Sequence, residues 1–365
     1  MRHSIFTIIA PVVLAFPAVA ETIESSIGPL EISAQVEGLQ TPWAFDFLPG
    51  GAILITEREG RLWIAENGQK TEVSGLPKIK VDGQGGLLDV MVPRDFAETR
   101  EVFFTYAKSQ WIRGSGTAVY RATLSEDGTR LTNGETIFEI KRGTGGGYHF
   151  GSRLVEARDG TLFVTIGDRG NGDLAQDLSM HNGSVVRITR DGEAPGDNPF
   201  VGGDGLAEIY SYGHRNPQGA ALDPSGQLWV AEHGAQGGDE VNRIEAGVNY
   251  GWPVISYGVN YNGTKIGEGT AKDGMAQPVH YWDPSIAPSG MAFYDGDLLG
   301  DWRGDAFVGS LKFDYISRLS GDPLTEVEQI KGEATARVRD VAQGPDGALW
   351  FLSVLNDALY RIAPQ

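Results

Sequence analysis

A histidine behind a run of glycines is the residue best suited to acid–base chemistry in this sequence. His149 stands in GTGGGYHFGSRL (143–154), and Asp168 follows in TIGDRG (165–170). Histidine exchanges a proton near neutral pH, and a carboxylate that orients its ring can make it a general base. A loop histidine can equally be a solvated or space-filling residue. The choice depends on whether the fold brings His149 and Asp168 together.

The segment between these two residues has the pattern of a β-hairpin. An apolar run reaches a turn at Arg158-Asp159-Gly160, and the return run from Leu162 to Ile166 leads into Asp168. Apolar runs joined by a Gly-containing turn are typical of hairpins, whose two ends lie at the same edge of a sheet. We therefore expect His149 and Asp168 to share one edge.

The same form recurs along the chain. An apolar run and a Gly turn with Asp or Pro, in most copies followed by a second apolar run, occur at 42–56, 85–107, 150–165, 216–231, 287–300 and 338–352. A further strand-like unit follows each copy: GRLWIA, AVYRATL, SVVRITR, EVNRIEA, YISRLSG and ALYRIAP. Six repeats of about 57 residues indicate radial repetition of small antiparallel sheets. The sequence therefore predicts an all-β protein, a six-bladed β-propeller of four-stranded antiparallel blades.

We expect residues 21–365 to form this propeller as a single domain, because no linker or change of composition divides them. No stretch of about 12 residues has the periodicity of an amphipathic helix. A β-sandwich, the competing all-β fold, would not explain a sixfold repeat. Phe163, Trp229 and Trp350 fall at matching strand positions, which predicts that they belong to blade cores.

Further ionisable residues fall at the rim position of His149 and Asp168. When the repeats are aligned on their turns, Arg215 matches His149 and Lys312 matches Asp168, while His233 and Arg337 are one place off. Apolar packing between blades stabilises a propeller, so stability does not require charge there. Ionisable groups gathered at a concave mouth are a candidate site. This arrangement favours His149 as a general base over a structural histidine.

The segment AEHGAQGGDEVNRIEAGVNYGWP (231–253) has the composition of an oxygen-rich cation site. It places Asp239 and Glu240 beside a Gly-rich bend with carbonyls at Gly234 and Ala235. Calcium takes carboxylate and carbonyl oxygens in flexible geometry, whereas zinc is disfavoured because no HExxH motif or histidine cluster accompanies the segment. Loops rich in Asp and Gly are also common turns, so both interpretations stay open on this segment alone.

The chain starts with the features of a secretory signal peptide. Arg2 and His3 precede an apolar stretch from Ile5 to Phe16, and Ala18-Val19-Ala20 fits a cleavage site. We therefore expect residues 1–20 to direct export to a bacterial periplasm.

Composition limits the possible partners. The sequence has no cysteine and a net charge of −18 at pH 7. An exported protein without cysteine has no disulfide framework, so burial must stabilise it. Strong negative charge argues against nucleic acid and anionic membrane surfaces as partners. No later stretch approaches the roughly 20 apolar residues of a spanning helix. The sequence therefore predicts no nucleic-acid partner and no membrane insertion.

Nine motifs carry a resemblance to a known family. The motifs are GQGGLLDV, GYHFGSRL, TIGDRG, YGHRNPQGAALDPSG, AEHGAQGGDEVNRI, NYGWP, APSG, GSLKFD and RVRDVAQGPDGALW. In this order they resemble the soluble quinoprotein sugar dehydrogenases, the glucose/sorbosone dehydrogenase family, and more closely its compact periplasmic aldose sugar dehydrogenases. The resemblance implies a six-bladed propeller that binds pyrroloquinoline quinone (PQQ) and Ca²⁺ on one face.

The resemblance also implies roles for the matched residues. His149 would take the proton of an aldose's anomeric hydroxyl while hydride passes to C5 of PQQ, with Asp168 and Gln84 beside it. Arg215 and Asn216 would contact the quinone oxygens. Lys312, Arg337 and Arg339 would bind the PQQ carboxylates, and Tyr261 would contact the cofactor. Gly234 and Ala235 would hold a calcium ion shared with PQQ. Glu240 and Tyr250 would hold a second calcium ion.

Some residues depart from the family pattern. His233 stands where the glucose-specialised members carry glutamine, and Asp283-Pro284-Ser285 replaces an aromatic-containing stretch. Insertions that shape the sugar pocket and the dimer contact of those members are missing. The resemblance therefore implies a broad aldose preference in a monomer and leaves the electron acceptor unknown. Tyr148 is the candidate for stacking on the sugar.

Two other functions remain open on the sequence. A calcium-dependent propeller sugar lactonase or other hydrolase would need metal-binding carboxylates at the channel centre, and would have no use for three carboxylate-binding cations. A non-enzymatic binding propeller would present an apolar or aromatic rim, whereas this rim is charged and mixed in sign.

Overall fold

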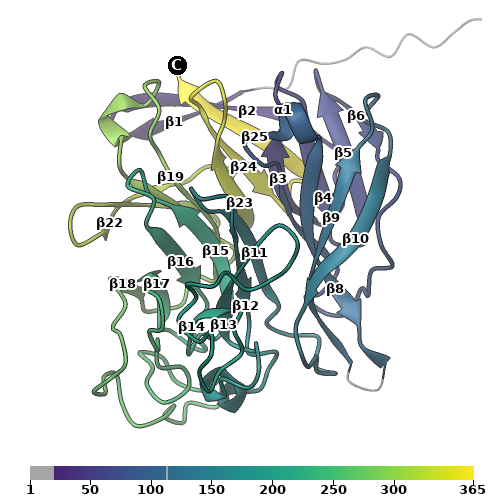
Figure 1. The fold of residues 1–365 in the computed structure, drawn as a ribbon. Helices are drawn as coiled ribbons and strands as arrows, with labels where there is room; N and C mark the ends of the chain where they lie inside the picture. The colour runs from purple at the N-terminus through teal and green to yellow at the C-terminus, as the bar shows by residue number, and fades with distance from the viewer. Residues whose placement is uncertain (1–19, 112–113) are drawn as a thin grey trace, which may run out of the picture.

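The computed structural model describes residues 20–111 and 114–365, which form a six-bladed β-propeller (Figure 1). Apart from Ala20, the predicted signal peptide lies outside these residues. In each blade the strands are given from the innermost outward. Blade 1 contains β3 (Pro42–Phe47), β4 (Ile53–Glu57), β5 (Arg61–Glu66) and β6 (Gln69–Glu72), and blade 2 contains β7 (Leu87–Met91), β8 (Glu101–Ser109), β9 (Ser115–Leu124) and β10 (Leu131–Glu139). Blade 3 contains β11 (Gly151–Glu156), β12 (Leu162–Ile166), β13 (Ser184–Ile188) and β14 (Ile209–Tyr212).

Blades 4 and 5 follow the same plan. Blade 4 contains β15 (Pro217–Leu222), β16 (Leu228–Glu232), β17 (Asp239–Arg243) and β18 (His280–Trp282). Blade 5 contains β19 (Pro288–Phe293), β20 (Ala306–Ser310), β21 (Ile316–Ser320) and β22 (Thr325–Ile330). All neighbouring strands in these blades pair antiparallel. The units that the sequence repeat identified are the first three strands of each blade, except that in blade 5 they cover β19 and β21 and omit β20.

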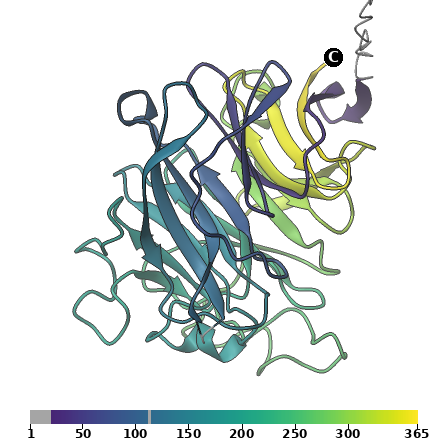
Figure 2. The same ribbon diagram turned by 90° about the vertical axis from the view of Figure 1, so that its right-hand side faces the viewer.

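The sixth blade combines the two ends of the chain. It contains β23 (Val338–Gln343), β24 (Leu349–Ser353) and β25 (Ala358–Pro364), followed outward by β2 (Gly28–Val36) and β1 (Glu21–Ser25). The purple N-terminal strands therefore lie beside the yellow C-terminal strands (Figures 1 and 2). This pairing closes the ring and gives the last blade a fifth strand, because the β1–β2 hairpin adds one strand beyond the expected four.

Helices are short throughout the described part of the chain. They are α1 (Phe96–Thr99) and the 3₁₀ turns η2 (Gly172–Gln176) and η3 (Gly300–Trp302). None of the described helices is long and apolar enough to cross a membrane.

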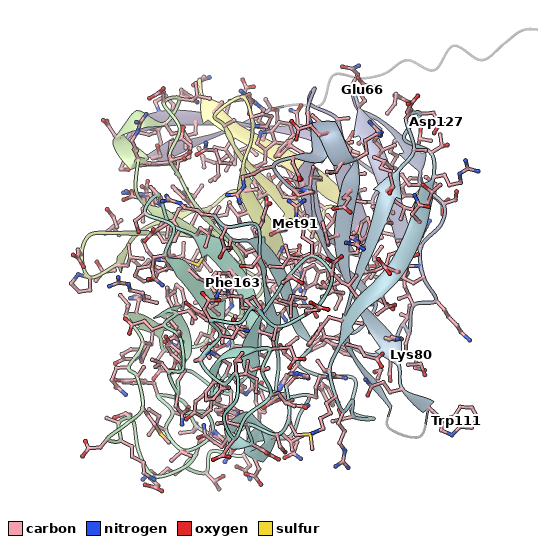
Figure 3. All side chains as sticks on the ribbon, viewed as in Figure 1. Glu66, Lys80, Met91, Trp111, Asp127 and Phe163 are labelled. Carbon is pink, nitrogen blue, oxygen red and sulfur yellow. The ribbon has the colours of Figure 1, made fainter. Side chains whose placement is uncertain are left out.

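The apolar core is divided into six clusters, one between each pair of neighbouring blades. Phe163 and Trp350 are buried in two of them, and Trp229 packs half-buried against a third, as their matching strand positions predicted. In Figure 3, Met91 and Phe163 lie within the ribbon, whereas Trp111 projects from its periphery. Burial of each large apolar side chain stabilises the fold by roughly 1.5–3 kcal/mol, so the blades hold one another in place.

A β-bulge near the start of each innermost strand shapes the channel mouth. The register shifts at this place in β3, β7, β11, β15, β19 and β23. In three blades the extra residue is Trp43, Gln218 or Arg339. A bulge redirects a side chain that regular pairing would place on a sheet face, and these three side chains line a cavity at the mouth.

Hydroxyl groups connect successive bulges. Thr56, Thr105 and Thr165, each on the second strand of a blade, donate to a carbonyl at the start of the next blade's innermost strand at 2.6, 2.7 and 3.0 Å. All three hydroxyls are buried, so these bonds fix the rim positions of one blade relative to the next.

Candidate active site

The six ionisable residues expected at the rim lie at hairpin ends on one side of the propeller. His149, Arg215 and Arg337 come one or two residues before β11, β15 and β23, and Asp168, His233 and Lys312 come within two residues after β12, β16 and β20. The pairs Gly151–Ile166, Pro217–Glu232 and Val338–Ser353 end these hairpins. The expected placement of these six positions at one edge of the blades is therefore correct for the backbone.

Rim residues from several blades enclose a cavity of about 670 Å³, here called the cationic cavity. Its charged lining residues are Arg58, Lys312, Asp314, Arg337 and Arg339. The single carboxylate among them already accepts the backbone N–H of Arg337 at 2.8 Å. Four cations against one engaged carboxylate make this cavity a site for an anionic ligand.

Arg339 is half-buried and has no carboxylate hydrogen bonded to it. Its guanidinium lies over the Trp43 ring at 4.4 Å and donates to Gln218 Oε1 at 2.6 Å, while its Nε is buried without a partner. The pKa of Arg339 is lowered to about 9, mainly by burial and also by the charges of Arg153 and Arg337, with Asp340 and Asp89 partly offsetting these effects. An anion bound here would stabilise this charge.

His149 and Asp168 form a hydrogen-bonded pair beside the cationic cavity. His149 Nδ1 lies 2.7 Å from Asp168 Oδ1, which also accepts the Gly170 N–H at 2.7 Å. Trp252 Nε1 donates to Asp168 Oδ2 at 2.8 Å. Because the carboxylate is an acceptor on both oxygens, Nδ1 carries the proton and Nε2 has a free lone pair. This is the arrangement of a general base with an orienting carboxylate.

The backbone of His149 is fixed independently of its ring. Its φ is 49°, in the left-handed region, and its N–H donates to Gln84 Oε1 at 2.8 Å. The Gln84 N–H in turn donates to the Gly147 carbonyl at 2.8 Å. A Cβ at Gly167 would overlap the His149 carbonyl, so glycine is needed there. Gln84 therefore lines the cationic cavity and also positions the histidine.

Arg215 and Asn216 lie deeper, at the start of β15. The guanidinium of Arg215 donates to the carbonyls of His233 and Gly234, lies 5.3 Å from the Trp252 ring centre and leaves its Nε buried without a partner. Asn216 Oδ1 accepts the Gly151 N–H at 3.2 Å. In this structure Asn216 therefore connects blades 3 and 4.

His233 is a second histidine that lines the cationic cavity. Its Nε2 lies 2.7 Å from the carbonyl of Pro288 at the start of blade 5. Burial lowers the pKa of His233 to about 3, and the charges of Arg215 and Arg339 contribute in the same direction. The ring is therefore neutral at neutral pH.

Asp239, in the segment with calcium-like composition, has a structural role. Its Oδ1 accepts the Gly234 N–H at 2.8 Å, and its Oδ2 accepts from the Ser285 hydroxyl and the Ala287 N–H at 2.7 and 2.8 Å. Burial raises the pKa of Asp239. This carboxyl group therefore fastens the Gly-rich bend to the segment that departs from the family pattern.

Glu240 lies in a different environment. It lines an enclosure of about 20 Å³ together with Glu232, Gly234 and Tyr250, and that volume is enough for one ion or water. The pKa of Glu240 is raised to about 8, mainly by burial and also by the charge of Glu232. The described residues contain no cluster of three or more metal-ligating side chains. A cation here would therefore depend on backbone carbonyls as well.

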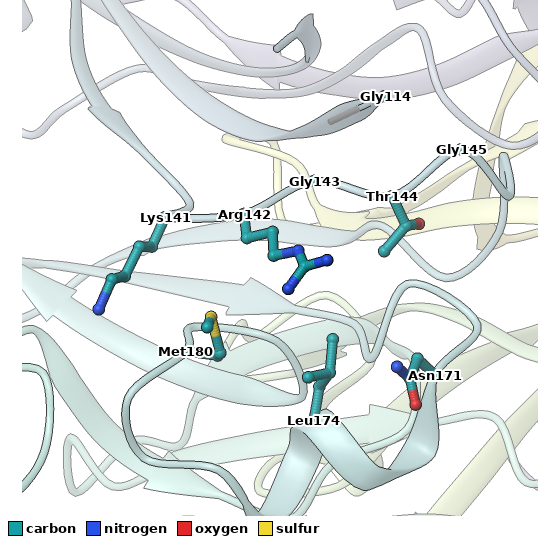
Figure 4. A pocket seen from close by; sticks show the side chains of 9 residues that line it. All are labelled: Gly114, Lys141, Arg142, Gly143, Thr144, Gly145, Asn171, Leu174 and Met180. Atoms are coloured by element: carbon teal, nitrogen blue, oxygen red, sulfur yellow. The ribbon is translucent and has the colours of Figure 1, made fainter. Parts of the chain in front are cut away.

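A second hollow, here called the loop-side cavity, has a volume of about 910 Å³ (Figure 4). Its walls come from the segments 141–145 and 171–180, together with Gly114. Both segments are also bonded to the chain around Asp168. Thr144 Oγ1 donates to the Arg169 carbonyl at 2.9 Å, and the Asn171 N–H donates to the Asp168 carbonyl at 3.2 Å. Leu174 and Met180 add an apolar patch.

Two predicted contact residues lie outside both cavities. Tyr261 is 77% exposed, and Tyr148 is 57% exposed with its ring centre 6.3 Å from that of His149. The sequence reasoning assigned no role to Trp43, Arg58 or Gln218, which line the cationic cavity, or to Trp252, which holds Asp168. Trp43 lay in the repeat copy at 42–56, Gln218 in YGHRNPQGAALDPSG and Trp252 in NYGWP, whereas Arg58 lay in none of these.

A β-propeller with a cationic cavity and a histidine–aspartate pair at one mouth of its channel is the class of molecule that the fold and site define. The model of the family described as Glucose / Sorbosone dehydrogenase matches residues 39–361. The chain therefore belongs to this family.

Relatives over nearly the whole chain agree with this assignment. The aldose sugar dehydrogenase YliI of Escherichia coli is 43% identical over 349 residues, which is 92% of this chain and 94% of the relative. The crystal structure of the soluble aldose sugar dehydrogenase from Escherichia coli, in the apo form, has a TM-score of 0.88 at 40% identity and covers 92% and 100% of the two chains. The PQQ-bound form of an aldose sugar dehydrogenase from Streptomyces coelicolor has a TM-score of 0.76 at 28% identity and covers 96% and 99%.

Proposed function

We propose that this protein oxidises aldose sugars at the anomeric carbon to lactones, with PQQ as cofactor and Ca²⁺ as its metal ion. The family and the named activities of the relatives support sugar oxidation. The proposal that PQQ is the cofactor and His149 the base rests on one observation: the cationic cavity lies beside the His149–Asp168 pair.

His149 acts as the general base. Asp168 holds the Nδ1–H, so Nε2 accepts the proton from the anomeric hydroxyl as the C–O bond gains double-bond character. When bound, PQQ supplies the two-electron acceptor for the hydride from the same carbon. Proton and hydride leave the sugar separately, and the product is the lactone. Gln84 and Trp252 keep the base in place through His149 N–H and Asp168 Oδ2.

The chemistry of the cationic cavity fits PQQ, which carries three carboxylates. Lys312, Arg337 and Arg339 would hold those carboxylates. The buried, unpartnered Nε of Arg339 and its lowered pKa indicate that an anion is needed there. Arg215, with its own buried unpartnered Nε, would stabilise negative charge on the quinone oxygens. Asn216 would contact the same quinone oxygens, and Tyr261, on an exposed loop, would contact the cofactor.

The enclosure beside Glu240 fits a calcium ion. Its carboxyl group is buried near that of Glu232, and such closely placed carboxyl groups are stabilised by a cation. The Tyr250 carbonyl would complete this structural site. The carbonyls of Gly234 and Ala235 would hold a second ion, and a calcium ion there would polarise the cofactor.

The loop-side cavity is the place we assign to the sugar. Asn171, Lys141 and backbone amides offer hydrogen bonds, while Leu174 and Met180 offer apolar contact for sugar C–H groups. Tyr148 stands exposed beside the base and would stack on the ring. The volume of this cavity, about 910 Å³, leads us to expect a broad aldose preference.

A reconstitution experiment tests the proposal. Purified protein receives PQQ, Ca²⁺, an aldose and a redox dye, and bleaching of the dye should require all of the first three. His149→Ala should abolish bleaching, whereas His280→Ala, on the outer strand β18, should not. Failure of PQQ to bind, or turnover of a sugar lactone without PQQ, would instead support a hydrolase.

We also propose that residues 1–20 are a signal peptide and that the domain over 21–365 acts in the periplasm as a monomer. The export-like start supports the signal peptide, and the missing insertions of the dimer contact support the monomer. N-terminal sequencing of the protein purified from a periplasmic fraction and light scattering would test both statements.

A further inference from the structure

His233 is a cavity residue to which neither proton transfer nor charge matching gives a role. It lies directly after β16, and its ring crosses to blade 5, where Nε2 meets the Pro288 carbonyl at 2.7 Å. Its backbone is held on both sides: the N–H donates to the Asn216 carbonyl at 3.1 Å, and its carbonyl accepts from Arg215 at 3.3 Å. The ring is therefore fixed in direction.

The contact with Pro288 decides the tautomer of this ring. A carbonyl only accepts, so Nε2 is the protonated nitrogen and Nδ1 has a free lone pair. Nδ1 makes no hydrogen bond within the described structure, and it does not belong to the buried atoms that lack a partner. The ring lines the cationic cavity, so this nitrogen is open to a ligand there.

The groups around the ring are mainly donors. The guanidinium group of Arg215 donates to the His233 carbonyl, and Arg339 lines the same cavity. His233 is thus an acceptor in a cavity whose charged lining residues are mainly cationic donors.

We propose that His233 makes the cavity discriminate between the two redox states of its cofactor, by accepting a hydrogen bond from a hydroxyl that only the reduced form carries. This inference rests on the proposed function. Oxidised PQQ presents two carbonyl oxygens, and uptake of two electrons and two protons converts them to hydroxyls. Donors such as Arg215 can bond to these oxygens in either redox state, whereas an acceptor gains a partner only in the reduced form, which alone carries hydroxyl donors.

Titration of both redox states tests this role apart from turnover. Protein with Ca²⁺ is titrated with oxidised PQQ in air and with chemically reduced PQQ without oxygen, and quenching of tryptophan fluorescence gives each Kd. One hydrogen bond predicts that His233→Leu lowers the ratio of Kd for oxidised to Kd for reduced PQQ by roughly 3- to 10-fold. For a two-electron couple a tenfold loss corresponds to a midpoint potential lower by about 30 mV.

Two variants separate this role from a purely structural one. His233→Gln keeps an N–H for Pro288 and an oxygen for the ligand, so it should retain the ratio within about twofold. His280→Leu, distant from the cavity, should leave both Kd values unchanged. If His233→Leu weakens both redox states equally, His233 only clamps the blades and the inference is wrong. If neither form of PQQ binds the unmodified protein, the proposed function fails as well.

Discussion

The two cavities that flank His149 are built in different ways. The cationic cavity is formed by strand ends and by bulges of the innermost strands, including Trp43, Gln218 and Arg339. The loop-side cavity is formed mainly by connections between strands, the segments 141–145 and 171–180. Strand ends tied together across blades are rigid, whereas loops vary in length and sequence between relatives.

This difference separates two tasks. A cofactor with fixed charges needs cations at fixed places, and the repeated bulge supplies these places from several blades. A substrate that differs from one relative to another is better accommodated by loops. Both cavities are tied to the His149–Asp168 pair. Gln84, which lines the cationic cavity, accepts the His149 N–H, and Thr144, which lines the loop-side cavity, donates to the carbonyl of Arg169 next to Asp168.

Removal of the base should have the largest effect. His149→Ala should reduce kcat by roughly 10²- to 10⁴-fold, because proton removal loses its positioned acceptor. The Kd for PQQ should change by less than about twofold, because the cations of the other cavity stay. Steady-state kinetics and a PQQ titration measure both values. Near-normal kcat would remove His149 from its assigned role.

A substitution in the cationic cavity should act on the cofactor alone. Lys312→Ala should weaken PQQ binding by roughly 10- to 100-fold, the effect of losing one charge-assisted bond. Arg142→Ala removes a cation from the loop-side cavity and is the matched control: the Kd for PQQ should remain unchanged. Equal weakening by both variants would mean that only the overall charge matters and that the two cavities are not distinct.

Calcium binding at Glu240 should depend on pH. Its pKa is raised to about 8 by burial and by Glu232, so at pH 7 a proton occupies the carboxyl group that calcium needs. Calcium affinity should therefore fall on acidification, by up to about tenfold from pH 8 to pH 7, and level off at higher pH. Calorimetry at several pH values measures this. Glu240→Gln should abolish the dependence together with the binding; an unchanged slope in that variant would assign the proton to another group.

The smallest effect should come from the loop-side cavity. Leu174→Ala removes apolar contact and should raise the KM for an aldose by roughly 3- to 10-fold, with little change in kcat or in the Kd for PQQ. A panel of aldoses measures whether the increase differs between sugars. A change in PQQ affinity without a change in KM would reverse the assignment of the two cavities.

Local sequence patterns were sufficient to predict that His149 and Asp168 lie side by side. His149 and Asp168 bracket one hairpin, and a hairpin returns its two ends to the same edge whatever surrounds it. The same reasoning located Arg215, Lys312 and Arg337 on that rim. Of the bulged residues, Arg339 was assigned through the family resemblance, whereas Trp43 and Gln218 were missed because regular alternation gives no signal for one extra residue. Arg58 was missed because a single cation on a turn is normal on any surface.

The sequence by itself determined the repeat, the blade number and the side of the propeller on which the ionisable residues lie, because these depend on local hairpins whose turn residues are visible in the chain. Only the tertiary structure decided that β2 and β1 complete the last blade, that Arg153 and Arg339 both lie over the ring of Trp43, and that His233 directs Nε2 to Pro288 and leaves Nδ1 free for the cavity. These features join segments far apart in the chain. Their geometry depends on ring closure and on contacts between blades, which no local pattern of residues contains.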